Sequence, residues 1–130
     1  MKVAQIINKH DQTNRILVSS FHPLPLRRFH TLLPSVPIGF LARRGYSGAL
    51  SRSWFGKAIV PYQALHPEKS DISRTLVNKA HQSDKRVHTY TVNSPKEMLR
   101  LLSLGVDGII TDDPLAACQV TDVLTSTKIN

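Results

Sequence analysis

The side chains of this chain that could act in acid–base chemistry are spread along it and form no single motif. His22 follows a predicted strand, at the end where barrel enzymes carry their chemistry, and His66 precedes Pro67 in a predicted loop. Histidine is the commonest general acid or base near neutral pH. A simpler interpretation is favoured for both: His22 is an exposed loop residue and His66 is a turn residue. A third histidine, His88, lies in a predicted strand and is expected to pack in the core.

Two adjacent carboxylates, Asp112 and Asp113, suggest a metal site because hard divalent cations prefer oxygen ligands. Asp113 is better explained as a helix N-cap, since Pro114 follows it. Asp112 remains open as a pocket residue. The one cysteine, Cys118, rules out an internal disulfide and is interpreted as a small apolar residue on a buried helix face.

A basic segment is the third candidate. Gly45-Tyr46-Ser47-Gly48 lies among Arg43, Arg44 and Arg52 and could cradle a phosphate group, although it lacks the P-loop pattern and a flexible basic loop is favoured. The formal charge of +8 and the pI of about 10.1 suggest phosphate-bearing ligands, an anionic membrane surface or nucleic acid. Specific nucleic-acid binding is not expected, because aromatic residues make up only 6% and no arginine–aromatic stripe occurs.

The clearest structural elements lie near the C-terminus. Residues 87–92 are β-branched and aromatic, which is typical of a strand. Ser94-Pro95-Lys96-Glu97 predicts a helix start with a capping box, in which Ser94 caps and Glu97 reaches back. An apolar stripe at helical spacing then leads to Gly105, which suits the position beyond a helix end. A second strand and a last helix, starting at Asp113-Pro114, follow.

The whole chain shows the same alternation of strand and helix. Strands are predicted at residues 15–21, 37–42, 57–62, 86–92 and 107–111, and helices at 2–10, 25–33 and 71–85, with residues 64–70 as a loop. In the helix at 25–33, Leu26, Phe29 and Leu33 stand at helical spacing and are expected to line one face. This order favours a parallel α/β layer, and the length favours a single domain over residues 1–130. The count alone fits an open five-stranded doubly wound sheet, since five βα units cannot close an eight-stranded barrel.

The lengths of the apolar segments indicate whether the chain could span a membrane or carry a secretory signal. No stretch approaches about 18 continuous apolar residues, so no membrane span is expected. The first ten residues lack the sustained apolar core of a secretory signal. The expected location is therefore cytoplasmic.

Several segments resemble the glycerophosphodiester phosphodiesterase family. They are Ser19-Ser20-Phe21 with Pro25-Leu26, residues 34–41, His66-Pro67, and, most specifically, Thr91-Val92-Asn93 with the run from Gly105 to Pro114. The similarity covers nearly the whole chain. It implies an α/β fold that is the C-terminal portion, about five βα units, of a TIM (β/α)8 barrel and is incomplete in this chain.

The resemblance also implies an activity. Members of this family hydrolyse glycerophosphodiesters to glycerol 3-phosphate and an alcohol, with a divalent metal, Ca²⁺ or Mg²⁺, and two histidines as acid and base. The family's His-Arg-Gly motif and metal carboxylates lie upstream of the segments that this chain resembles, and no His-Arg-Gly occurs here. No catalytic or metal-binding residue is therefore assigned, and the chain alone is expected to be inactive and to bind no cofactor.

Residues of the family's substrate pocket can still be placed. Tyr90 stands where the family usually has an aromatic residue that contacts the glycerol side of the substrate, and Phe21 ends a strand beside the same pocket. Arg43, Arg44 and Asn93 follow strand ends on the same face. These five residues are the predicted contacts of a glycerophosphodiester substrate.

Two function classes remain open for this chain. It is a fragment of a lipid-metabolism hydrolase, whether truncated, split or started at an internal Met, or it is a non-catalytic basic module that binds phosphate-bearing ligands. If strands of the barrel are missing, residues 15–21 and 107–111 form open edges. Self-association is then expected, because unpaired edges invite strand pairing.

Overall fold

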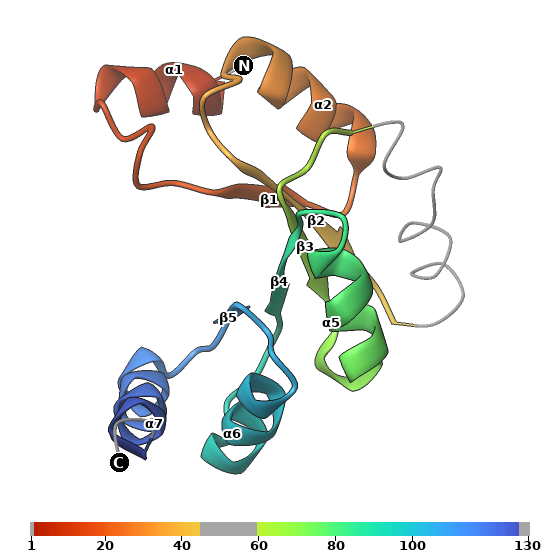
Figure 1. Cartoon of the computed structure of the whole chain (residues 1–130). Coiled ribbons are helices and arrows are strands. Elements are labelled where there is room, and N and C mark those ends of the chain that lie inside the picture. The colour runs from red at the N-terminus through yellow and green to blue at the C-terminus, as the bar shows by residue number, and fades with distance from the viewer. Residues whose placement is uncertain (1, 45–59, 128–130) are drawn as a thin grey trace. The chain divides into compact units, whose positions relative to one another are not determined.

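A computed structural model describes residues 2–44 and 60–127 of the 130-residue chain. Strands and helices alternate through it, as Figure 1 shows. The elements are α1 (Lys2–Lys9), β1 (Val18–Ser20), α2 (Pro23–Leu32), β2 (Ile38–Ala42), β3 (Ala64–Pro67), the 3₁₀ helix η1 (Lys69–Asp71), α5 (Arg74–His81), β4 (Arg86–Thr89), α6 (Pro95–Ser103), β5 (Gly108–Ile109) and α7 (Pro114–Thr127). The predicted α/β class is confirmed.

The strands form one sheet with the order β1-β2-β3-β4-β5. β1 and β2 are parallel, with Val18 opposite Ile38, and β4 and β5 are parallel, with His88 opposite Gly108. A doubly wound sheet reverses its strand order at a switch point, whereas a barrel adds its strands in sequence. The sequential order therefore favours the barrel type over the doubly wound sheet that the strand count alone suggested.

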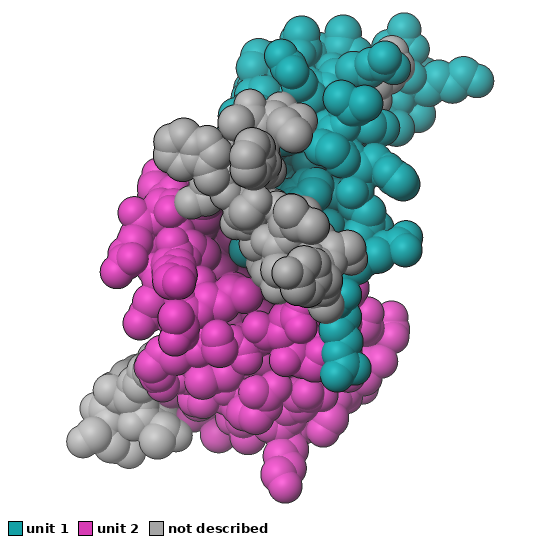
Figure 2. Space-filling model, turned by 90° about the vertical axis from the view of Figure 1, so that its right-hand side faces the viewer, with its two compact units in different colours: residues 1–66 teal, residues 67–130 magenta. Residues whose placement is uncertain are grey.

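The chain divides into two compact units, residues 1–66 (unit 1) and 67–130 (unit 2), shown in different colours in Figure 2. The single-domain expectation stays a prediction. None of the described helices has both the length and the apolar character needed to cross a bilayer.

Unit 1 is organised around α2 and the strands that it covers. Leu26 and Phe29, predicted to line one helix face, are each only 1% exposed, and Leu33 beyond the helix end is also buried. α2 contacts both β1 and β2. In β2, Ile38, Phe40 and Ala42 on one face are buried, and on the other face Gly39 is buried and Leu41 half-buried, which is typical of a strand covered on both faces.

Unit 2 has a continuous apolar core. Its buried members come from the helices, the strands and the loops beside them: Ile72, Val77, Ala80, Val87, Val92, Met98, Leu101, Val106 and Val120. Gly105 lies just beyond α6 with φ +95°, in the left-handed region, as predicted. Its N–H donates to the carbonyl of Leu102 (3.0 Å) and the N–H of Val106 donates to the carbonyl of Leu101 (3.5 Å), which is the Schellman pattern of hydrogen bonds.

The third predicted strand is misplaced. Residues 57–59 lie outside the described residues, and residues 60–62 are not a strand; the strand is Ala64–Pro67, which was predicted to be a loop. Pairing begins at Gln63, whose N–H donates to the carbonyl of Ile38 (2.9 Å). Proline at the end of β3 looked like a turn signal. In the structure its carbonyl accepts from the Thr89 hydroxyl at the end of β4 (Arg86–Thr89) and from the backbone N–H of Tyr90 just after it.

The prediction for Cys118 is wrong, because this residue is exposed on α7. The helix buries Val120 instead, and Leu115 at its start is 69% exposed. The predicted open edges correspond to β1 and β5, the outer strands of the sheet. Self-association through them stays a prediction.

Asp107 joins three elements of unit 2. Its Oδ2 accepts from the backbone N–H of Val87 in β4 (2.7 Å) and lies 2.8 Å from Nε2 of His81 at the end of α5. Partial burial opposes ionisation of this carboxyl. The hydrogen bonds from Val87 and His81, with the positive charge of the histidine, outweigh it and lower the pKa of Asp107.

We predict that Asp107→Asn lowers the free energy of unfolding by about 1 kcal/mol at neutral pH, since it weakens a charge-assisted hydrogen bond in a partly exposed position. A lowered folded-state pKa gives stability that is complete above the unfolded value of about 3.9 and is lost as the pH falls through the folded value. The difference between wild type and variant should therefore shrink in acid. Urea unfolding from neutral to acid pH measures it.

The control is Asp122→Asn, which removes an exposed acid from α7 in the same unit. It should leave stability within about 0.5 kcal/mol of wild type at all pH values. An Asp107→Asn variant that matches this control at neutral pH would contradict the structural role of the carboxylate.

Candidate functional site

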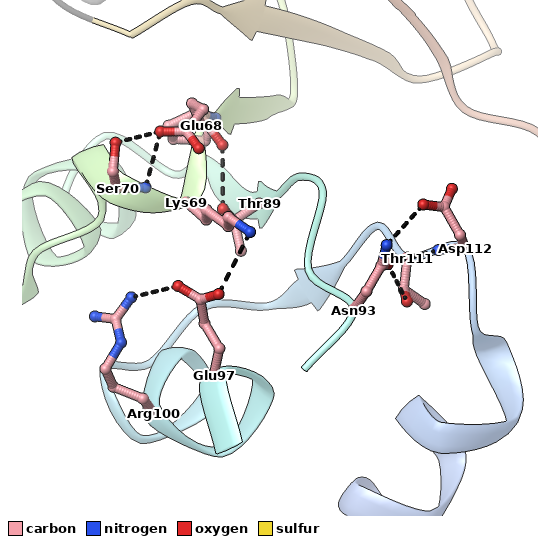
Figure 3. Close-up of polar contacts among 10 residues, drawn as sticks. Glu68, Lys69, Ser70, Thr89, Asn93, Glu97, Arg100, Thr111 and Asp112 are labelled. Carbon is pink, nitrogen blue, oxygen red and sulfur yellow. Dashed lines mark hydrogen bonds and ion pairs between the residues drawn. The ribbon is translucent and has the colours of Figure 1, made fainter. Parts of the chain in front are cut away.

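Polar side chains gather in unit 2 where β4 and β5 end, and we call Asn93, Thr111 and Asp112 the strand-end cluster (Figure 3). Asn93 lies between β4 and α6, and the other two lie between β5 and α7. Backbone bonds continue the β4–β5 ladder up to this point: Ile110 donates to Thr89 (2.8 Å) and Val92 donates to Ile110 (3.0 Å). The ladder thus brings residues 18 or 19 positions apart in the sequence together.

Asn93 holds the loop that follows β5 with three hydrogen bonds. Its Oδ1 accepts from the backbone N–H of Asp112 (3.0 Å) and from the Thr111 hydroxyl (3.1 Å), and its Nδ2 donates to Oδ2 of Asp112 (2.8 Å). An amide is the side chain that can do both, because it carries an acceptor and two donors. The predicted site residue Asn93 therefore orients Asp112, the carboxylate left open by the sequence.

The adjacent carboxylate, Asp113, serves the helix. Its Oδ1 accepts from the backbone N–H of Ala116 (3.0 Å), and Pro114 takes the first position of α7. This confirms Asp113 as the N-cap. Its own N–H donates to the Thr111 hydroxyl (3.0 Å), so the cap is attached to the strand-end cluster.

A second group of polar side chains connects η1 with α6. Oε2 of Glu97 lies 3.4 Å from Nζ of Lys69, and its Oε1 lies 3.5 Å from Nη2 of Arg100, as Figure 3 shows. The N-cap position of Ser94 is confirmed, but the capping box is wrong, because Ser94 makes no side-chain cap bond. Glu97 turns instead toward two cations, since an ion pair competes with the backbone donor for the same carboxylate.

In unit 1 the ends of β1 and β2 bring together two predicted site residues. The guanidinium carbon of Arg43 lies 5.1 Å from the ring centroid of Phe21, within the range of a cation–π contact. Phe21 is 37% exposed and Arg43 and Arg44 are exposed. Arg52 and Gly45 to Gly48 lie outside the described residues.

The three candidate histidines have different environments. His22 is exposed at the N-cap of α2, which confirms the simpler interpretation. His66 is only 2% exposed and lies in β3, so its interpretation as a turn residue is wrong. A Cβ on Gly39 would lie 2.6 Å from its ring, so glycine is what admits the imidazole beside β2.

His88 is half-buried in β4, as predicted for a residue that packs in the fold. Burial lowers its pKa below the usual value, and Arg86 lowers it further while Asp107 opposes this. The imidazole packs against Gly108, where an added Cβ would lie 2.9 Å from its Cδ2. Its environment is that of a structural residue.

Tyr90 pairs by its backbone with the end of β3. Its N–H donates to Pro67 (3.4 Å) and its carbonyl accepts from Lys69 (3.1 Å), and the residue is half-buried. The predicted contacts therefore divide into Phe21 with Arg43 and Arg44 in unit 1, and Tyr90 with Asn93 in unit 2. Sequence reasoning missed the role of Thr111, although its position after a β-branched pair was a usable signal for a strand-end hydroxyl.

These features define a class: a parallel α/β protein of barrel type with polar and aromatic side chains at the carboxyl ends of its strands. The chain belongs to the glycerophosphoryl diester phosphodiesterase family, whose model matches residues 1–116.

Relatives support this assignment over most of the chain. It is 30% identical over 123 residues, 93% of its length, to a glycerophosphodiester phosphodiesterase of Bacillus altitudinis, and covers 49% of that protein. It is 31% identical over 113 residues, 87% of its length, to one from Caldanaerobacter subterraneus, and covers 45% of it. The chain thus spans about half the length of these relatives.

Solved structures share the fold. The chain aligns with a phosphodiesterase of Oleispira antarctica in complex with sn-glycerol-3-phosphate at a TM-score of 0.79 and 21% identity, covering 92% of this chain and 47% of that one. It aligns with a glycerophosphodiester phosphodiesterase of Parabacteroides distasonis at 0.77 and 21% identity, covering 98% and 50%. The chain is therefore a part of a (β/α)8 barrel.

The family is metal-dependent, and the residues present can be tested for a fit to a divalent ion. Within residues 2–44 and 60–127, no group of three or more His, Cys, Asp or Glu residues could hold one. Asp113 caps a helix and Asp112 accepts from Asn93. The described residues therefore do not fit the metal. The expectation that this chain alone binds no metal stays a prediction.

We predict that Asn93→Ala releases the backbone of the loop after β5. Asn93 accepts from the N–H of Asp112, so amide hydrogen exchange at Asp112 should accelerate by about tenfold, the equivalent of 1.4 kcal/mol, within the range of one lost hydrogen bond. The amide of Asp107, bonded to Val87, is the internal control and should keep its rate. An unchanged exchange rate at the Asp112 amide would contradict the role of Asn93 in holding this loop.

Proposed function

We propose that this chain forms part of the substrate-binding wall of a glycerophosphodiester phosphodiesterase and does not hydrolyse the substrate alone. The observation that carries the proposal is that the side chains at its strand ends lie inside the segment matched by the family model. Ligands of parallel α/β folds bind at the carboxyl ends of the strands. The phosphate of a phosphodiester is anionic, so nearby cations stabilise it. One of the esterified alcohol groups is neutral or apolar, so an aromatic side chain can pack against it.

Each unit, taken by itself, carries strand-end groups that suit one chemical feature of such a ligand. In unit 1, Arg43 supplies a positive charge held over the ring of Phe21, and Arg44 follows it. In unit 2, Asn93 fixes the direction of the Asp112 carboxylate, which can accept hydrogen bonds from the hydroxyls of a glycerol group. The relative from Oleispira antarctica was solved with sn-glycerol-3-phosphate, which carries both a phosphate and such hydroxyls.

The chemical step requires groups that the described residues do not assemble. Hydrolysis needs a base for water, an acid for the leaving oxygen, and neutralisation of charge on the phosphoryl oxygens. Among the candidate histidines, His66 is buried in β3, His88 packs against Gly108 in β4 and His22 is exposed at the N-cap of α2; within the described ranges no group of three or more metal-ligand side chains could hold a metal ion. The non-catalytic alternative, a basic module for phosphate-bearing ligands, rests on the same arginines and likewise predicts no hydrolysis by this chain alone.

We predict that the purified chain releases no glycerol 3-phosphate from glycerophosphocholine above the buffer rate, with or without Ca²⁺ or Mg²⁺. The reason is that the His-Arg-Gly motif of the family does not occur in this sequence and that the described residues hold no group of three or more possible metal ligands. An enzyme-coupled assay for glycerol 3-phosphate measures the release, with a full-length relative as the positive control. Metal-dependent release that His22→Ala abolishes would show that the catalytic centre lies in this chain after all.

We predict weak binding of glycerol 3-phosphate, seen as NMR shifts at residues 21, 43 and 44. Each exposed charge contact should contribute at most about 1 kcal/mol, and binding should weaken between about 10 mM and 200 mM salt. Arg43→Ala plus Arg44→Ala should remove most of it. The matched control is Arg27→Ala plus Arg28→Ala, which removes equal charge from α2; equal losses in both pairs would rule out a site at the strand ends.

A further inference from the structure

The net positive charge of this protein comes from one of its two units. Residues 1–66 contain nine of the 17 Lys and Arg residues and only one of the nine acidic residues, Asp11, so the whole formal charge of +8 belongs to unit 1. Residues 67–130 balance eight basic against eight acidic residues. Neither the family assignment nor a site for one small phosphate ester needs so large an asymmetry.

Unit 1 also exposes large aliphatic side chains beside these cations on α2. Leu24 is 63% exposed and Leu32 is 52% exposed. With Arg28 between them they stand at positions i, i+4 and i+8, which lie on one face of a helix. Arg27, also exposed, borders the same face.

This outward face is not the one that α2 uses in the fold. Leu26 and Phe29 on the other side are each 1% exposed, and the helix contacts β1 and β2. α2 connects β1 and β2, which pair with each other, and its buried face already packs on these two strands. A helix that covers a parallel sheet turns its remaining face to solvent.

We propose that the outward face of α2, formed by Leu24, Arg27, Arg28 and Leu32, docks unit 1 on the surface of an anionic phospholipid bilayer. The two leucines would enter the boundary between headgroups and acyl chains, and the arginines would contact lipid phosphates, as in other interfacial amphipathic helices. The net charge of unit 1 adds long-range attraction. The inference goes beyond the proposed function, since it needs no hydrolysis and no strand-end residue.

The aliphatic residues favour a bilayer over nucleic acid. Single-stranded nucleic acid is held by aromatic stacking, and duplex DNA by phosphate contacts that do not use protruding leucines. Docking would hold this protein at the source of lipid-derived phosphodiesters. Because the face has only two apolar anchors and two cations, the binding should be reversible and sensitive to salt.

The test is co-sedimentation of the full chain with vesicles. Vesicles of equal parts phosphatidylcholine and phosphatidylglycerol should bind it at about 10 mM salt and release most of it at about 200 mM, and pure phosphatidylcholine vesicles should not bind it. Arg27→Gln plus Arg28→Gln should weaken binding by roughly 10- to 30-fold. Leu24→Ser plus Leu32→Ser should weaken it by about tenfold or more.

The matched control is Lys79→Gln plus Lys96→Gln, which removes the same charge from exposed positions of unit 2 and should change binding by less than about twofold. Equal weakening by the two charge pairs would overturn the proposal in favour of net charge alone. Absence of binding to the anionic vesicles would overturn it outright, and so would capture of duplex DNA in place of vesicles through the same α2 residues. Thermal melts of each variant confirm that the exposed changes leave the fold intact.

Discussion

One carboxylate fixes where the chain enters β5. Asp107 accepts from the backbone of Val87 in β4 and from His81 at the end of α5, just before the short strand Gly108–Ile109 begins. A strand of two residues has few ladder bonds of its own, so this side chain and the Schellman turn at Gly105 set its entry. From there the ladder leads directly to the strand-end cluster. The positions of Asn93, Thr111 and Asp112 thus depend on a structural contact that binds no ligand.

The strand-end residues use their polar groups mainly on each other. The Asn93 side chain uses its acceptor and one donor in hydrogen bonds to the loop after β5, and the Asp113 carboxylate accepts a hydrogen bond at the start of α7. Preorganisation of this kind reduces the entropy that a ligand must remove when it binds. It also explains why adjacent carboxylates in the described part of the chain do not amount to a metal site.

The two units differ in chemical character as well as in sequence. Unit 1 carries the net positive charge, with an arginine over an aromatic ring and exposed leucines on α2. Unit 2 is balanced in charge and uses its acids in pairs and caps, as with Glu97 between Lys69 and Arg100. A barrel scaffold tolerates this division, because residues at strand ends and on outer helix faces vary without disturbing the packed core.

Local patterns in the sequence determined much of this protein. Gly105, Asp113-Pro114 and the apolar stripes of α2 and α6 act within a turn or two of themselves, so their roles could be predicted and are confirmed. The family resemblance rested on such local runs. Tertiary structure alone decided the rest: β3 falls at Ala64–Pro67 because it pairs with β2 and β4, and His66 is buried because Gly39 on the adjacent strand leaves room for its ring. Glu97 forms an ion pair with Lys69, which is 28 residues away in the sequence, and not the local capping bond that was predicted. Contacts of this kind depend on which distant strands become neighbours, and no local propensity encodes that.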